Sequence, residues 1–220
     1  DIVVTGCPVD PLFESNPAAP DSKELRHILV VGGADPRKNP ELAVRAHAGS
    51  AIMQRGPGIP LVLAGNYSSI DAAAFRAVAA ASGGRPELIE VPGQISDRDL
   101  LDFYHGAFAT VCASRDEGFS LPIIEGMAAR SVVLASDIPV HRELVADAGQ
   151  RFPVDDDGAL CSLLERAVTD HAWRSALLAQ QSLIWPRFRA VKVAERFWTG
   201  VAQRIFAAPA SPMVIQGRKS

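Results

Sequence analysis

Residues 108–125 read FATVCASRDEGFSLPIIE, and this stretch decides the fold class. The apolar run 108–113 has the length and composition of a buried strand, and the residues from 121 onward have the spacing of a helix. A buried strand followed closely by a helix is the repeating unit of a parallel sheet with helices on both faces. The stretch therefore predicts an α/β protein with a doubly wound parallel sheet.

The same unit repeats along the chain. Short apolar runs closed by Gly, Pro, Ser or Asp predict strands over 27–32, 61–64, 88–91, 108–113, 132–135 and 150–154. Apolar residues at helical spacing predict helices over 40–54, 71–81, 97–104, 121–129, 139–146, 156–169, 172–183 and 189–206. This alternation predicts a Rossmann-like sheet, in which ligands bind beyond the carboxyl ends of the strands.

Two glutamates, Glu117 and Glu125, bracket the start of the helix in the deciding stretch. A helix that begins near Ser120 directs free backbone N–H groups and the positive end of its dipole into the crevice above the sheet, where phosphate is stabilised. Carboxylates accept hydrogen bonds from hydroxyls. A ligand with hydroxyls on both sides of a doubly charged centre is a nucleotide sugar.

A second polar loop follows the first strand. Gly32 and Gly33 leave room for a ligand to approach the backbone, and Arg37 and Lys38 follow within reach of the crevice. Lys38 is the expected phosphate partner. The alternative is that 35–40 is only a solvated turn and helix cap.

Three separated motifs, in this order, resemble the family 4 (group 1) retaining glycosyltransferases of GT-B fold. Residues 30–39, VVGGADPRKN, look like the phosphate-binding loop of their donor domain. Residues 117–125 look like the Glu-x7-Glu signature, and 132–137 with 141–145 look like the strand, turn and helix that follow it. The resemblance covers about residues 25 to 200 and implies the carboxyl-terminal, donor-binding half of a GT-B enzyme.

The resemblance implies roles for three candidate catalytic residues. Glu117 binds hydroxyls of the donor sugar. Lys38, helped by Arg37, neutralises the leaving nucleoside diphosphate, whose departure builds negative charge in the transition state.

It also implies a set of nucleotide-binding residues. The loop after the third strand meets the base, the amides at the helix start approach the pyrophosphate, and Glu125 binds the ribose hydroxyls. The implied set is Gly33, Gly93, Gln94, Ile95, Gly118, Phe119, Ser120, Leu121 and Glu125.

The chain departs from the family pattern in three places. Many members carry arginine at the position of Gly33, and the family turns through Gly-x-Pro where this chain has Arg130-Ser131-Val132. The chain also covers only one of two Rossmann-like domains. We expect 1–24 to be an interdomain linker or N-terminal extension, with 16–22 as its Pro/Ala-rich linker. We expect 25–207 to bind the nucleotide sugar, 208–220 to form a flexible tail, and an N-terminal acceptor-binding domain to be the missing partner.

Composition limits the alternatives. The 220 residues carry a net charge of −3 and are 48% hydrophobic, which does not favour nucleic acid as a partner. No apolar run has the length of a membrane span, and peripheral membrane association is left to the missing domain. Cys7, Cys112 and Cys161 are far apart, so neither a zinc site nor a disulfide framework is indicated, and a reducing cytoplasm fits best. The start at Asp1, without a Met, suggests a fragment.

Metal-dependent chemistry has two candidate acidic patterns, around 97–99 and 155–157. Both look like helix starts, because Ser96 and Asp99 have capping-box spacing and aspartates favour a helix N-terminus. His141 lies near the expected crevice, but a packing or capping histidine is the simpler interpretation. We therefore expect no metal and no cofactor beyond the donor substrate.

The expected function is donor binding in a retaining transfer of a hexose from a nucleoside-diphosphate sugar to a glycan, lipid or small-molecule acceptor. Two alternatives stay open. One is a nucleotide-sugar epimerase on the same fold, although Lys38 with paired glutamates suits a transferase better. The other is a non-catalytic nucleotide-sugar-binding partner subunit, which Gly33 and the missing half favour.

Overall fold

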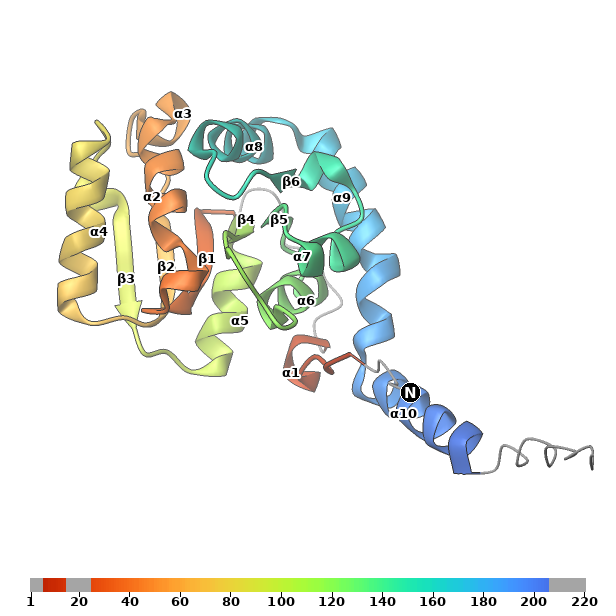
Figure 1. The fold of residues 1–220 in the computed structure, drawn as a ribbon. Helices are drawn as coiled ribbons and strands as arrows, with labels where there is room; N and C mark the ends of the chain where they lie inside the picture. Colours follow the sequence, from red (N-terminus) through yellow and green to blue (C-terminus); the bar gives the residue numbers. More distant parts are fainter. Residues whose placement is uncertain (1–5, 15–24, 206–220) are drawn as a thin grey trace, which may run out of the picture.

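A computed structural model describes residues 6–14 and 25–205 of the chain (Figure 1). Both the 16–22 linker and the 208–220 tail lie outside these ranges. The core is a six-stranded parallel sheet in the order β3-β2-β1-β4-β5-β6. Its strands are β1 (His27–Gly33), β2 (Leu61–Asn66), β3 (Ile89–Gly93), β4 (Ala107–Cys112), β5 (Val133–Ser136) and β6 (Arg151–Phe152). The predicted fold class is confirmed.

Helices cover both faces of this sheet and enclose two hydrophobic cores. Side chains alternate along each strand, so Ile28 and Val30 belong to one core and Leu29 to the other. The first core is covered by α2 (Pro40–Gly49), α4 (Ser69–Ala81) and α8 (Asp157–Thr169). The second is covered by α5 (Asp97–His105), α6 (Leu121–Ala128) and α7 (Pro139–Leu144). Burial on both faces explains why the strands read as nearly continuous apolar runs.

Helix starts agree with the acidic patterns in the sequence. The Ser96 hydroxyl accepts from the backbone N–H of Asp99, and the Asp99 carboxylate accepts from the backbone N–H of Ser96. This is the expected capping box at the start of α5. The Asp156 carboxylate accepts from the backbone N–H of Ala159 at 2.8 Å at the start of α8. These aspartates therefore stabilise helix N-termini, as predicted.

The expected helix 40–54 is wrong in one respect: it is broken at Ser50. Ser50 has extended backbone angles, and the helix restarts as α3 (Ala51–Gln54). The buried Ser50 hydroxyl makes two hydrogen bonds that explain the break. Its Oγ accepts from the Met53 N–H at 3.2 Å and donates to Glu165 Oε1 of α8 at 2.7 Å. A serine that bonds locally and across to a neighbouring helix competes with the continuous helical ladder.

The expected strands 150–154 and 88–91 also differ from the structure. Gln150 closes a 3₁₀ turn, η4 (Ala148–Gln150), and leaves only Arg151–Phe152 paired with β5. Its side-chain amide donates to the Val133 carbonyl at 2.9 Å, so the side chain rather than the backbone makes this contact with β5. A second turn, η3 (Pro86–Leu88), delays the start of β3 to Ile89.

The remaining elements lie near the two ends of the chain. They are α1 (Pro11–Glu14), α9 (His171–Ile184), the 3₁₀ turn η5 (Trp185–Phe188) and α10 (Ala190–Ile205), which extends away from the body (Figure 1). Phe13 of α1 packs edge-to-face on Tyr104 with ring centroids 5.7 Å apart, and Glu14 pairs with Arg189 at 2.8 Å. The described part of the expected 1–24 linker or extension thus packs against the 25–207 unit, and the domain boundaries themselves stay predictions.

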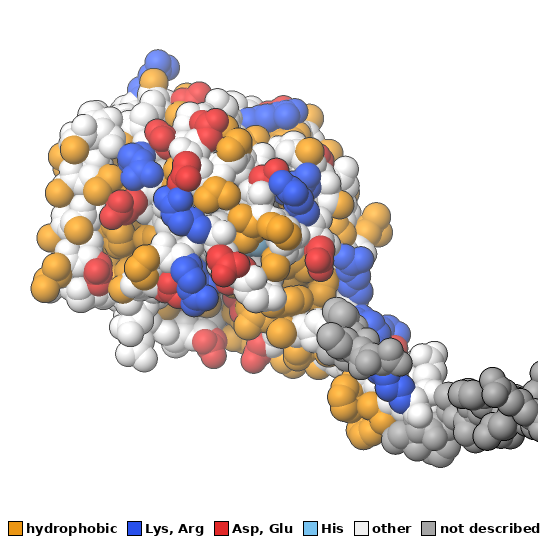
Figure 2. All heavy atoms as spheres, viewed as in Figure 1, with side chains coloured by type: hydrophobic (Ala, Val, Ile, Leu, Met, Phe, Trp, Pro, Cys, Tyr) orange, Lys and Arg blue, Asp and Glu red, His pale blue; other side chains and the backbone are white. Residues whose placement is uncertain are grey.

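The surface agrees with the modest net charge. Figure 2 shows acidic and basic side chains interspersed over one face, with no broad patch of a single sign. No helix in the described ranges is both long enough and apolar enough to cross a membrane.

One glycine shapes the edge of the sheet where ligands are expected. Gly65, at φ 146°, lies opposite Gly32 in the β1–β2 register, and a Cβ at Gly65 would overlap the Gly32 carbonyl oxygen. Only glycine permits this approach. The ends of β1 and β2 are thereby held together, and Gly32 and Gly33 are the last residues of β1 rather than part of the loop that follows it.

Candidate functional site

The loops after β1 and β4 bring together two residues that are far apart in the sequence. Lys38 Nζ donates to Glu117 Oε1 at 2.6 Å, and Ser114 Oγ donates to the same oxygen at 2.7 Å. The side chains of Lys38 and Glu117 are 26% and 12% exposed, so the pair is accessible but largely screened from water. A cation and a hydroxyl therefore fix the orientation of one carboxylate at the carboxyl edge of the sheet.

The turn that carries Lys38 is firmly anchored. It is the 3₁₀ turn η2 (Pro36–Lys38), capped by the Asp35 carboxylate, which accepts from the Arg37 N–H at 2.9 Å. Asn39 has left-handed angles, and its Nδ2 donates to the Val154 carbonyl at 3.2 Å. A Cβ at Gly32 would come 3.3 Å from the Tyr67 hydroxyl oxygen, which is a tight contact, and 3.6 Å from Lys38 Cγ, which is an ordinary one.

Arg37 is held away from this pair. Its guanidinium forms an ion pair with Asp35 at 2.7 Å, and its side chain is 65% exposed. Hydrogen bonding to Asp35 raises the pKa of Arg37 and lowers that of Asp35. The structure thus places Lys38, and not Arg37, in contact with Glu117.

The start of α6 offers free backbone donors beside Glu117. Ser120 has φ 79°, and its side chain makes no capping bond. Among the described residues, no acceptor receives the backbone N–H of Phe119, Ser120 or Leu121. A Cβ at Gly118 would meet nothing within 4 Å, so the space above the loop is open. The helix therefore presents an uncapped N-terminus to an open region, which suits an anion.

Glu125 lies one turn further along α6 in a different environment. Its Oε2 accepts from the Tyr104 hydroxyl at 2.9 Å, and burial raises the pKa of the Glu125 carboxyl. Glu125 also lines a cavity of about 420 Å³ with residues of the N-terminal segment and of α5, including Asp10, Phe13 and Asp97. One carboxylate oxygen is thus held by a neutral hydroxyl at the wall of a cavity.

A buried histidine lies behind the Lys38–Glu117 pair. His141 Nδ1 is 3.0 Å from the Ser136 carbonyl, while Ser136 Oγ donates to the Ser114 carbonyl at 2.5 Å. Because Ser136 has used its hydroxyl proton, we assign the His141 proton to Nδ1, which donates to the carbonyl. His141 Nε2 is buried and has no partner among the described residues, and burial lowers the pKa of this histidine.

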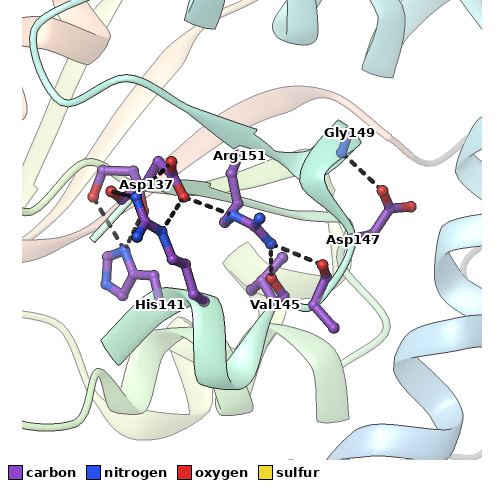
Figure 3. A network of polar contacts seen from close by, with 9 residues as sticks. Asp137, His141, Val145, Asp147, Gly149 and Arg151 are labelled. Carbon is purple, nitrogen blue, oxygen red and sulfur yellow. Dashed lines mark hydrogen bonds and ion pairs between the residues drawn. The ribbon is translucent and has the colours of Figure 1, made fainter. Parts of the chain in front are cut away.

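Ser136 links His141 to the carboxylate through adjacent strands. Ser136 ends β5, and Ser114, which follows β4, bonds both to Ser136 and to Glu117. Figure 3 shows His141 beside Asp137, whose carboxylate accepts from Arg151 at 2.8 Å. The predicted packing role of His141 is therefore refined. His141 is at one end of a series of hydrogen bonds that runs through Ser136 and Ser114 to Glu117 at the other end.

Comparison with known proteins identifies the family of the chain. The sequence pattern of the family described as Glycosyl transferases group 1 matches residues 13–177. The chain belongs to the group 1 glycosyltransferases.

Curated relatives agree with this assignment. The O-antigen chain mannosyltransferase B of Escherichia coli is 30% identical over 154 residues, which cover 70% of this chain and 40% of that protein. The D-inositol 3-phosphate glycosyltransferase of Acidothermus cellulolyticus is 30% identical over 171 residues, covering 72% and 38%. The chain thus spans about two fifths of the length of these relatives.

Solved structures share the fold of this group 1 glycosyltransferase. HepE of Anabaena, in complex with UDP, has a TM-score of 0.74 at 15% identity, covering 92% of this chain and 57% of that one. WaaG, a glycosyltransferase involved in lipopolysaccharide biosynthesis, has a TM-score of 0.71 at 16% identity, covering 94% and 56%. These matches give no support to the epimerase alternative.

The loop after β3 has no hydrogen bond to the other candidate site residues in the described part of the chain. Gly93 has φ 77°, Gln94 is exposed, and Ile95 lines a cavity of about 580 Å³ against α5. The contact of this loop with a base stays a prediction.

Three site residues were not predicted from the sequence. Ser114 orients Glu117, Tyr104 orients Glu125, and Ser136 connects Ser114 to the buried histidine. Ser114 and Ser136 each carry a weak signal, because both are polar residues at the carboxyl end of a predicted strand. Tyr104 carries none, because it has the spacing of an ordinary core residue of α5.

Proposed function

We propose that this group 1 glycosyltransferase chain is the donor-binding part of a retaining enzyme that transfers a hexose from a nucleoside-diphosphate sugar. The Lys38–Glu117 pair beside the uncapped start of α6 carries the proposal, because it joins a cation, a carboxylate and free N–H groups at one place. The named mannosyltransferases among the relatives support a hexose donor. A structural neighbour at 18% identity, a trehalose-6-phosphate synthase, is described as transferring with retention.

In this proposal the diphosphate binds at the start of α6. The N–H groups of Phe119, Ser120 and Leu121 donate to the pyrophosphate, and Lys38 supplies the positive charge. Lys38 then balances the charge that develops on the leaving diphosphate, which is stabilisation of the transition state rather than proton transfer. Arg37 joins it only if a ligand phosphate outcompetes Asp35 for its guanidinium.

Glu117 and Glu125 bind hydroxyls at opposite ends of the donor. Glu117 is next to the open space above Gly118, where the sugar would lie. Glu125 offers its second oxygen to the ribose while Tyr104 holds the first. Gly33 and the loop Gly93, Gln94 and Ile95 complete the proposed nucleotide site.

The proposed acceptor-binding site is not part of this chain. Because the chain spans about two fifths of its curated relatives, we propose that a further domain binds the acceptor and closes over the donor. Transfer requires two reactants held in line, so the chain alone should bind donor without transferring it to an acceptor. An activated-sugar substrate and free Cys7, Cys112 and Cys161 suit a cytoplasmic enzyme.

Calorimetry of the chain against UDP, GDP, ADP and dTDP, with the matching monophosphates, tests the proposal. One diphosphate should bind better than its monophosphate, and Lys38→Ala should weaken it about tenfold or more, since a charge-assisted hydrogen bond contributes about 1.5–3 kcal/mol. Lys192→Ala on exposed α10 is the matched control and should bind normally. Equal affinity for diphosphate and monophosphate, unchanged in Lys38→Ala, would refute the assignment.

A further inference from the structure

A second polar cavity lies at the opposite edge of the sheet. Its volume is about 370 Å³, and it is formed where β4 and β5 begin and where α9 crosses them. Apolar walls come from Phe108, Val132 and Leu178. The donor site lies at the carboxyl ends of the strands, so this cavity is a separate place in the fold.

Three basic side chains line the cavity: Arg130, His171 and Arg174. None of its lining residues in the described ranges is an aspartate or a glutamate. The two arginines therefore place positive charge next to apolar walls, where a charge interaction is less screened than in water.

Arg174 is fixed as a permanent charge in the wall. It is only 5% exposed, and its Nη1 donates to the Ala167 carbonyl at 2.7 Å. Its Nη2 donates to His171 Nδ1 at 2.8 Å, which leaves the His171 proton on Nε2. Burial lowers the pKa of Arg174, and Asp170, already paired with Arg166, offsets this only in part.

Arg130 is the unsatisfied member of the group. It has φ 61°, a left-handed conformation that non-glycine residues rarely adopt, in the turn that follows α6. Its Nε is buried and has no acceptor among the described residues. A buried guanidinium N–H without an acceptor is unfavourable, unless a bound anion supplies one. Arg130 thus lines the cavity and carries a buried donor that has no acceptor among the described residues.

We propose that this cavity binds a phosphomonoester, with Arg130 donating to the phosphate oxygens, Arg174 supplying positive charge and His171 Nε2–H supplying a further donor. The planar guanidinium matches phosphate geometry, and the apolar walls accept the organic part of the ligand. The same chemistry occurs in a free organic phosphate and in a phospholipid headgroup. The site is independent of the proposed donor site.

Titration of the 220-residue chain with glycerol 3-phosphate tests the site, with affinity from calorimetry and location from amide ¹H–¹⁵N shifts. Arg130→Gly is the informative variant, because glycine is comfortable at φ 61° and the fold should be kept. It should weaken glycerol 3-phosphate at least about tenfold and leave nucleoside-diphosphate binding unchanged. Lys38→Ala should leave the affinity for glycerol 3-phosphate unchanged. Arg76→Gln, at an exposed position of α4, is the matched control.

Flotation with vesicles of phosphatidylcholine, with and without phosphatidic acid, separates the two sources of the phosphate. Binding of glycerol 3-phosphate without flotation identifies a soluble ligand. Flotation that needs both phosphatidic acid and Arg130 identifies a lipid headgroup. The proposal is overturned if neither probe binds, if Arg130→Gly binds as the wild type does, or if Lys38→Ala abolishes the binding of glycerol 3-phosphate.

Discussion

Glu117 and Glu125 belong to one motif but occupy opposite environments. Glu117 lies in a loop, where a lysine ammonium and a serine hydroxyl donate to the same oxygen. Glu125 lies on α6, where a buried tyrosine hydroxyl is its partner and burial raises the pKa of its carboxyl. A repeated residue type therefore does not imply a repeated role.

The two carboxylates differ in whether ligand binding competes for their hydrogen-bond partner. Glu117 shares Lys38 with any incoming phosphate, so ligand binding and the ion pair compete for one ammonium group. Tyr104 does not interact with phosphate in the proposed site, so Glu125 keeps its partner and uses its other oxygen. Substitutions at the two positions should therefore have different effects on different ligands.

The largest expected effect comes from the isosteric pair Glu117→Gln and Glu125→Gln. Glu125→Gln should weaken the nucleoside diphosphate and the nucleotide sugar alike, by about 1–3 kcal/mol for an imperfectly satisfied hydroxyl. Glu117→Gln should weaken only the nucleotide sugar by a similar amount. It should leave the diphosphate as tight as in the wild type or tighter, because Lys38 is released.

Calorimetry measures the binding free energy of both variants for the diphosphate and for the corresponding nucleotide sugar. Circular dichroism should show wild-type folding for both. If Glu117→Gln weakens the free diphosphate as strongly as the sugar donor, Glu117 is not a sugar-binding residue and the contrast between the two glutamates fails.

A smaller effect should come from the residues behind Glu117. Ser114→Ala removes one of its two donors and should weaken the nucleotide sugar by about 0.5–1.5 kcal/mol. His141→Phe removes the donor to the Ser136 carbonyl and should act in the same direction, whereas His141→Asn, which can keep a donor near Nδ1, should restore most of the affinity. Because all three residues belong to one hydrogen-bonded chain, Ser114→Ala and His141→Phe should combine less than additively.

The affinity of the same variants for the free diphosphate, which is assigned to Glu125 and not to Glu117, is the control for this prediction. Both His141 variants should bind the free diphosphate as the wild type does, since the chain ends at Glu117. A loss of diphosphate affinity in His141→Phe, equal to its loss of sugar-donor affinity, would indicate a general packing defect.

The contrast also shows what the sequence can and cannot predict. The order of strands and helices and the positions of Lys38, Glu117 and Glu125 were predictable, because periodicity and capping residues are local signals. The Tyr104–Glu125 bond was not, because it depends on how α5 packs on α6. The chain from His141 to Glu117 depends on the relative positions of the ends of β4 and β5, which no local pattern contains.

Local competition accounts for the other differences. Arg37 carries the charge expected of a phosphate partner, yet its guanidinium pairs with Asp35, two residues earlier in the chain. Ser50 has a position inside an apolar helical pattern, yet its hydroxyl bonds to Glu165 of the neighbouring helix α8, and the helix breaks there. In both cases a polar side chain bonds to a partner that the sequence pattern did not indicate.

The smallest expected effect is a pH dependence of folding that belongs to Glu125. Burial raises the pKa of this carboxyl in the folded chain, so the folded state binds its proton more tightly than the unfolded state does. The free energy of unfolding should therefore fall as pH rises from the ordinary glutamate pKa through the raised value. Glu125→Gln has no carboxyl to titrate, so it should gain stability relative to the wild type as pH rises above the ordinary glutamate pKa.

Tyr104→Phe should steepen the same dependence. The Tyr104 hydroxyl donates to the ionised carboxylate and lowers the pKa of Glu125, so removing it should raise that pKa further and extend the fall in stability to higher pH. Urea unfolding of the wild type, Glu125→Gln, Tyr104→Phe and the double variant, at several pH values, isolates the contribution of Glu125. Adding Glu125→Gln should remove the extra slope of Tyr104→Phe. If the slope survives in the double variant, another group is responsible, and the buried, neutral-partnered environment assigned to Glu125 does not control its charge.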